Sequence, residues 1–335
     1  MSVAKVTYPS RLSYDLVPWI SAATATVCAV IFDSSLSGLW FLPWTLGLLL
    51  FGLPHGACDH LVASKLTGRR STGDALGFVL FYLGAAAVVF ELWMVDATLA
   101  LALFLALTAW HWGSADAAHR REEEGLAPFF IAAAARGALV ISAPVAFHPE
   151  QCLSAFAGIV SVFGEAPAWN VERLATLAVA GLVLSVIVEA SVIFSDLVRR
   201  CARSALRGAV EILLLIALYS LVSAITAVGA YFVFWHAWRH VLRVSELLEE
   251  PGSRRERRLV STLVGYHAKA LPLTLLSLAL MIVLTLVSGL QEPQQLLGIY
   301  IVLISALTAP HATLISIWDI GADAIDRRWD SRTGS

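Results

Sequence analysis

The chain has 335 residues, of which 58% are hydrophobic and 14% charged, and its mean hydropathy is +0.76. Soluble domains are about one quarter charged, so this composition excludes an ordinary water-soluble domain and predicts an integral membrane protein. The net charge of −2 gives no indication of nucleic-acid binding, and the four cysteines show neither a disulfide framework nor zinc-type spacing.

The N-terminal segment, residues 1–19, is polar, and we expect no removable signal peptide there. A spanning helix needs about 20 mostly apolar residues. Ten stretches meet this requirement, at about residues 15–33, 38–63, 74–93, 98–118, 127–147, 171–195, 205–222, 226–246, 266–288 and 295–319. We therefore predict an all-α, polytopic transmembrane helix bundle of about ten spans, which forms a single integral membrane domain over residues 1–335.

The connections between these stretches divide by charge. When each helix-end residue is counted with its nearest loop, all of the 23 Lys and Arg residues except Arg136 and Arg173 fall on one side. The positive-inside rule makes that side cytoplasmic. An even number of spans then places both termini in the cytoplasm, and we expect a multi-pass protein of the cell (inner) membrane.

Ionisable side chains within a bilayer are costly and usually mark function. Here they gather in four blocks of the predicted spans, all near the cytoplasmic half. The blocks are Gly52-Leu53-Pro54-His55-Gly56-Ala57-Cys58-Asp59-His60, Trp110-His111-Trp112-Gly113-Ser114-Ala115-Asp116, Phe234-Trp235-His236-Ala237-Trp238-Arg239-His240 and Thr308-Ala309-Pro310-His311-Ala312-Thr313. Their common depth predicts one shared site.

The pair His236 and His240 is the most specific local pattern. Residues four apart stack on one helix face, so two imidazoles could bind one metal ion. His55 and Asp59 have the same spacing, and the carboxylate could accept a proton from a neighbouring imidazole. His60 lies about 140° around the helix from His55, so both are not expected to face the same ion.

Each of these residues also has a simpler interpretation. A single histidine within a membrane often does no more than form a hydrogen bond between neighbouring helices. For His60 and His311 the sequence leaves three roles open: packing, support of a metal ligand, and direct binding of the metal. Asp59 and Asp116 are candidates for the same supporting role. Tryptophans commonly form interfacial belts, but Trp110, Trp112, Trp235 and Trp238 flank the histidines and would suit a flat, apolar substrate.

Four neutral imidazoles from three helices could hold a divalent ion, and imidazole suits iron, zinc and copper alike. A closed tetrahedral site would be structural, whereas a site with open positions could react with dioxygen. The chain has no CxxCH motif for haem attachment and no HExxH motif of a metalloprotease. These residues favour a membrane-embedded non-haem iron site that acts on a lipid-soluble substrate.

With these motifs, the chain resembles the Brp/Blh family of β-carotene 15,15′-dioxygenases, which make retinal in bacteria and archaea that carry rhodopsins. The resemblance rests on a motif within each block, and these motifs run in the family's order from about residue 50 to 315. They are Pro54-His55-Gly56-Ala57-Cys58-Asp59-His60, Trp110-His111-Trp112-Gly113, Trp235-His236-Ala237-Trp238-Arg239-His240 and Pro310-His311. The first and third blocks are specific, whereas a proline-histidine pair alone is weak. One departure is Cys58, where an aliphatic residue is expected; it touches no proposed ligand.

The resemblance implies an Fe(2+) centre bound by His55, His111, His236 and His240. It also implies cleavage of the central 15,15′ double bond of β-carotene by O₂, which gives two molecules of all-trans-retinal. The protein would contribute a hydrophobic tunnel lined by Trp110, Trp112, Trp235 and Trp238. A functional link to a retinal-binding rhodopsin and access of the substrate from the lipid bilayer are further expectations.

Rival functions predict different observations. A transporter or proton-relay protein with a structural histidine cluster would have a continuous polar path across the membrane and would carry ions in proteoliposomes. A haem-binding electron-transfer protein would show a Soret band. A related membrane enzyme that acts on another carotenoid or lipid would share the metal site.

Overall fold

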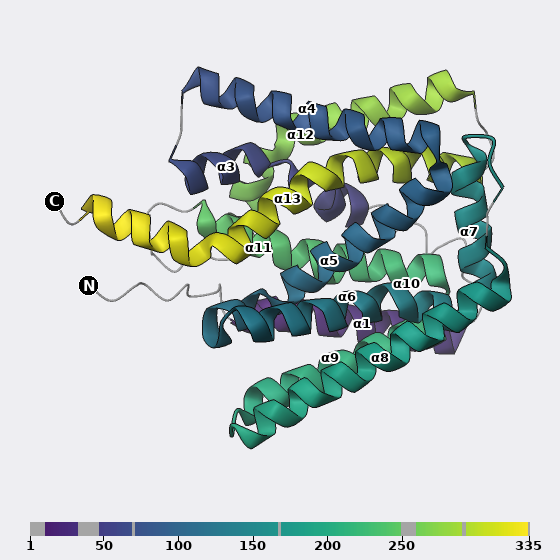
Figure 1. Ribbon diagram of the computed structural model, residues 1–335, viewed down its shortest axis with the longest axis horizontal. Coiled ribbons are helices and arrows are strands. Elements are labelled where there is room, and N and C mark those ends of the chain that lie inside the picture. The colour runs from purple at the N-terminus through teal and green to yellow at the C-terminus, as the bar shows by residue number, and fades with distance from the viewer. Residues whose placement is uncertain are drawn as a thin grey trace.

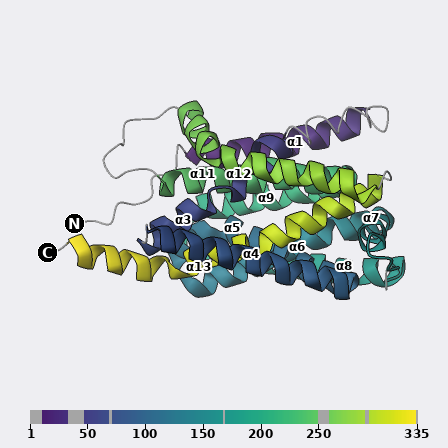
Figure 2. The same ribbon diagram turned by 90° about the horizontal axis from the view of Figure 1, so that it is seen from above.

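The computed structural model describes residues 11–32, 47–68, 71–166, 169–248, 259–289 and 293–333. Within these ranges the regular elements are helices, without strands. They are α1 (Arg11–Phe32), η2 (Leu48–Gly52), η3 (Pro54–Gly56), α3 (Asp59–Thr67), α4 (Thr72–Val95), α5 (Ala97–Glu124), α6 (Leu126–Phe147), α7 (Pro149–Ser161), α8 (Val171–Val198), α9 (Ala202–Leu221), α10 (Ala224–Tyr231), η4 (Phe232–Ala237), α11 (Trp238–Leu247), α12 (Leu259–Ser288) and α13 (Pro293–Thr333). Most run roughly along the long axis of the molecule, and the short α7 crosses one end (Figures 1 and 2).

Eight helical stretches are long and apolar enough to cross a membrane. They are Tyr14–Phe32, Thr72–Val95, Ala97–Ala118, Leu126–Phe147, Val171–Val198, Ala202–Leu221, Leu259–Ser288 and Gln295–Gly321. They correspond to eight of the ten predicted spans, so the predicted fold class, a polytopic helix bundle, is confirmed. The predicted cytoplasmic position of both termini stays a prediction, and residues 1–10 and 334–335 lie outside the described ranges.

The other two predicted spans are interrupted helices in the described part of the chain. The stretch 38–63 lies partly outside the described residues, and from Leu48 it consists of the π-helical η2, the 3₁₀ turn η3 and the start of α3. The stretch 226–246 is helical, but the π-helical η4 separates α10 from α11. Proline removes a helical hydrogen bond, which accounts for the break at Pro54. Both interrupted segments carry histidines predicted to bind metal, and π-helical turns often occur at functional sites.

Helices α5 and α6 cross in close contact beside one of the site histidines. A Cβ added at Gly113 would lie 2.0 Å from the carbonyl oxygen of Ala133, and one added at Gly137 would lie 2.1 Å from that of Ala109. Small residues four apart, Ala109 with Gly113 and Ala133 with Gly137, allow two backbones to approach within a membrane. This crossing fixes the position of His111, which lies between Ala109 and Gly113 on α5.

Helix α4 lies at one edge of the bundle, beside α13 and α5 (Figures 1 and 2). Trp93 is its buried residue, and the Trp93 indole donates a hydrogen bond to Ser305 of α13 at 2.7 Å. The rest of α4 exposes apolar side chains such as Leu80, Leu83 and Val88. Apolar side chains exposed along a whole helix are what contact with lipid requires.

Candidate metal centre

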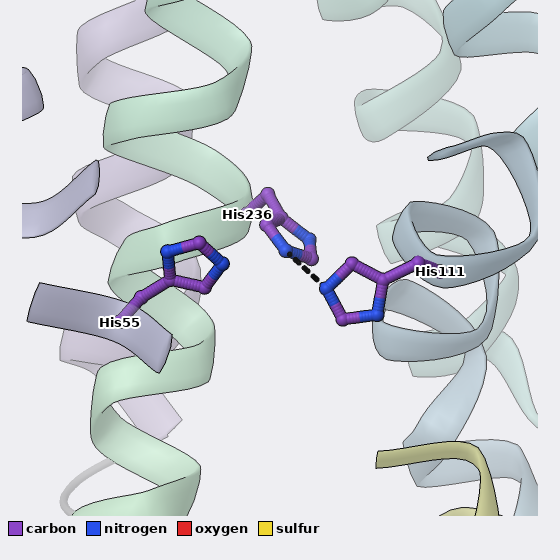
Figure 3. Close-up of side chains that lie close together, drawn as sticks. All are labelled: His55, His111 and His236. Carbon is purple, nitrogen blue, oxygen red and sulfur yellow. Dashed lines mark hydrogen bonds between the residues drawn. The ribbon is translucent and has the colours of Figure 1, made fainter. Parts of the chain in front are cut away.

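Three imidazoles from three separate segments meet inside the bundle. His55 comes from η3, His111 from α5 and His236 from η4 (Figure 3). One nitrogen from each ring can be chosen so that all three lie within 4.8 Å of one another. The Nε2 atoms of His111 and His236 are 3.2 Å apart. The structure thus brings together three of the four histidines that the sequence proposed as ligands.

The broken segment orients His55 through its own backbone. The Nδ1–H of His55 donates to the carbonyl oxygen of Gly52, at the end of η2. In that tautomer Nε2 carries the lone pair that a metal would need. The short 3₁₀ turn that begins at Pro54 therefore presents His55 to the cluster with its tautomer already set.

Two neighbouring side chains of α12 bond carbonyl groups of the broken segment. The hydroxyl of Tyr266 lies 2.7 Å from the carbonyl oxygen of Pro54 and 3.0 Å from that of His55. Nε2 of the next residue, His267, bonds the carbonyl oxygen of Leu50. Irregular backbone at membrane depth is tolerated where protein groups satisfy it. The sequence interpretation assigned neither Tyr266 nor His267 to the site.

The second member of the i, i+4 pair, His240, lies in the same cluster but outside the closest group of three. Its ring lies nearly parallel to that of His236, at 16°, with centroids 6.3 Å apart. Its centroid is 5.5 Å from that of His55 and 6.4 Å from that of His111. The helix spacing therefore places both rings on the same side, as the sequence predicted. Ligation by His240 stays a prediction.

The structure separates the two histidines that the sequence left open. His311 of α13 is buried, and its Nδ1 lies 2.9 and 2.8 Å from the two carboxylate oxygens of Asp59. Asp59 thus has an imidazole partner from another helix. His60 is exposed on α3, so its side chain lies away from the cluster. Its predicted supporting role is therefore not favoured.

Unpartnered nitrogen atoms indicate what the cluster can hold. In the described part of the chain, the buried ring nitrogens without a hydrogen-bond partner include Nδ1 of His111 and His236, both nitrogens of His240, and Nε2 of His311. Leaving a buried polar atom unsatisfied costs about 1–3 kcal/mol. A divalent cation would satisfy several at once, since neutral imidazole is a ligand of iron, zinc and copper. The residues present therefore fit a metal ion.

The predicted supporting residue Asp116 belongs to a network of buried charges beside the cluster. Its carboxylate accepts bonds from Tyr231 at 3.0 Å, Trp235 at 3.1 Å and Arg239 at 3.1 Å. Arg239 lies between the two histidines of the i, i+4 pair in sequence, and Asp116 lies five residues beyond His111. The ion pair therefore connects two of the helical segments that carry the site.

The network continues to the outer helices. Arg136 bonds Glu189 of α8 at 2.8 Å and Glu211 of α9 at 3.1 Å. Glu211 also binds Arg239. A cavity lies beside these charges, and its lining includes Asp116, Arg120, Arg136, Glu189, Arg207 and Glu211. Paired charges of this kind are the usual state of ionisable groups within a membrane.

The four tryptophans proposed as a tunnel lie in different environments. Trp112 is near the cluster, with its ring centroid 5.7 Å from that of His236. Trp110 stacks on Phe130 at 5.7 Å and donates to Ser316. Trp235 and Trp238 are buried; Trp235 stacks under the Arg239 guanidinium at 4.8 Å, and Trp238 packs against Phe51.

Phe232 completes an aromatic wall that the sequence interpretation missed. Its centroid lies 5.4 Å from that of His55 and 5.8 Å from that of Trp112. It precedes His236 by four residues, and that spacing on one helix face was the available signal. Among the described residues, Trp112 and Phe232 are therefore aromatic side chains that lie directly beside the histidines.

Comparison with known proteins places this arrangement in a family. The sequence model described as "Beta-carotene 15,15'-dioxygenase" matches residues 46–319. A "Probable beta-carotene 15,15'-dioxygenase Blh" of Halobacterium salinarum is 27% identical over 328 residues, which cover 90% of either chain. A "Probable beta-carotene 15,15'-dioxygenase Brp" of the same organism is 30% identical over 60% of this chain and 58% of its own. A "Beta-carotene 15,15'-dioxygenase" of an uncultured marine bacterium is 34% identical over 24% of this chain and 30% of its own. No solved structure matches the chain at a significant level.

Proposed function

The chain belongs to the beta-carotene 15,15′-dioxygenase family, and we therefore propose that it cleaves the central 15,15′ double bond of β-carotene with O₂ to give two molecules of all-trans-retinal. The metal of this proposal is Fe(2+), held by His55, His111, His236 and His240. The protein acts in the cell (inner) membrane, where its substrate is dissolved, and its product is available to a retinal-binding rhodopsin.

The observation that carries the proposal is the meeting of His55, His111 and His236, whose ligand atoms lie within 4.8 Å of one another. They come from three segments far apart in sequence, and His111 and His236 are fully buried. Gathering several imidazoles in an apolar interior is costly unless they share a ligand. A ferrous ion, when bound, supplies the one-electron chemistry by which O₂ reacts with a closed-shell olefin.

The chain's own residues contribute orientation and exclusion of water. The Gly52 carbonyl fixes the tautomer of His55, and Trp112 and Phe232 offer ring faces beside His55 and His236. A rigid polyene without hydrogen-bonding groups is positioned by such apolar contacts alone. In this proposal the midpoint of the polyene lies against the aromatic wall, with its 15,15′ bond toward the histidines.

Expression in carotene-accumulating bacterial cells tests the proposal. Cells with the wild-type chain should bleach, and all-trans-retinal should appear in their extracts at two molecules for each β-carotene consumed. His236→Ala and His55→Ala should abolish both changes, whereas His60→Ala, which alters an exposed residue, should not. Full activity of the first two variants, or loss of colour without retinal, would contradict the proposal.

A further inference from the structure

His311 has the position and the free nitrogen of a metal ligand. We infer that Nε2 of His311 is an additional imidazole ligand of the metal ion held by His55, His111 and His236, and that Asp59 orients it. This inference rests on the proposed function for the presence of the metal. It concerns a residue that neither the local spacing nor the closest group of three nitrogens identifies.

The ring of His311 lies close to three of the other imidazoles. Its centroid is 4.9 Å from that of His55, 4.8 Å from that of His111 and 5.0 Å from that of His240. By comparison, the rings of His55 and His111 are 6.5 Å apart, and those of His111 and His240 are 6.4 Å apart. His311 is thus closer to these three rings than the three are to one another.

The hydrogen bonds of His311 determine which nitrogen faces the cluster. Nδ1 is held by both carboxylate oxygens of Asp59 and therefore carries the proton. Nε2 is then the atom with the lone pair, and it is buried without a partner. In metal-binding histidines, one ring nitrogen commonly donates a hydrogen bond to a carboxylate, and the lone pair of the other nitrogen binds the metal.

Asp59 is itself held in place from the lipid-facing side. The hydroxyl of Tyr82 on α4 lies 3.0 Å from Asp59 Oδ2, so the chain of contacts runs from Tyr82 through Asp59 to His311. It joins α4, α3 and α13 around one imidazole. If His311 only packed against its neighbours, Asp59 would satisfy Nδ1, but the buried Nε2 would have no partner, which destabilises a folded protein.

The test uses purified full-length protein in detergent and measures metal rather than activity. The proteins compared are wild type, His311→Gln, Asp59→Asn and the control His60→Ala. Each is titrated with Fe(II) and, separately, with Co(II), whose visible absorption responds to the number of imidazole ligands. We expect more than about tenfold weaker Fe(II) binding and an altered Co(II) spectrum for His311→Gln. Asp59→Asn should weaken binding about tenfold, and His60→Ala should match wild type.

Wild-type affinity and an unchanged Co(II) spectrum in His311→Gln would overturn the inference. If that variant does not yield monodisperse protein, Asp59→Asn decides by the same two measurements, because it leaves the imidazole in place. The failure of the proposed function has a different signature, namely a folded wild type that binds no iron and forms no retinal. The role of His311 alone would be refuted if wild type binds iron, His236→Ala loses it and His311→Gln retains it.

Discussion

Arg239 and Asp116 form a buried ion pair in which Nη1 lies 3.1 Å from Oδ1, and it connects the segment that carries His236 and His240 to the helix that carries His111. Both side chains are almost completely buried. Glu211 is a second acceptor for the same guanidinium. The relative position of the two helices therefore depends on one arginine whose charge is shared between carboxylates of α5 and α9.

Replacement of Arg239 should destabilise the protein strongly, because it leaves Asp116 and Glu211 buried with one cation fewer. We expect Arg239→Ala to lose about 3–5 kcal/mol of stability, and Arg239→Lys to lose less because it keeps the charge but not the planar fork. These losses of stability are measured by thermal unfolding in detergent, in which the monodisperse fraction is recorded as the temperature rises. Arg173→Ala removes an exposed arginine of α8 and should leave unfolding unchanged. Equal losses in Arg239→Ala and Arg173→Ala would contradict this interpretation.

The close crossing of α5 and α6 should not accept a larger residue at Gly113. An alanine Cβ there would lie 2.0 Å from the Ala133 carbonyl oxygen, so the helices must separate. Overpacking of this kind costs about 1–3 kcal/mol or more, and the shift should also weaken metal binding through His111. Gly84→Ala on α4 meets no atom within 4 Å and should be neutral or slightly stabilising, by up to about 1 kcal/mol. Thermal unfolding and bound iron of the two variants make the comparison.

Trp112 and Trp110 should differ in their effect on catalysis although they are two residues apart. Trp112 lies against His236, whereas Trp110 stacks on Phe130. An aromatic contact contributes about 0.5–1.5 kcal/mol, or about a two- to tenfold change in binding. We expect Trp112→Phe to raise the KM for β-carotene within that range with iron content unchanged, and Trp110→Phe to leave KM near the wild-type value. A larger effect of Trp110→Phe would place the substrate on the other side of α5.

Removal of the metal should lower the free energy of unfolding, because a bound ion stabilises the folded chain. A ligand that binds only the folded chain adds about 2.7 kcal/mol at a concentration 100 times its Kd. The Tm of chelator-treated protein should therefore rise when Fe(II) is added back, together with recovery of retinal formation. His236→Ala should show no such rise. A Tm that does not respond to Fe(II) in the wild type would argue against a resident ion.

The sequence alone determined the class of fold and the residue types of the site. Long apolar stretches can satisfy their backbone in lipid only as helices, so a polytopic helix bundle follows from composition and length; of the ten spans predicted in this way, eight are confirmed. The histidines also stand out, because ionisable residues are rare within such stretches. The spacing of His236 and His240 correctly placed both rings on one side of the chain, because the i, i+4 relation is local.

Only the tertiary structure decided which side chains meet. Helical periodicity gives the face of a residue on its own helix, but not the neighbour against which that face packs. Asp59 therefore appeared as a partner for a nearby imidazole, and the fold assigned it to His311, 252 residues away in sequence. The same reason explains Asp116 with Arg239, and Tyr266 with the broken segment at Pro54, since each pair joins helices whose contact depends on packing of the whole bundle.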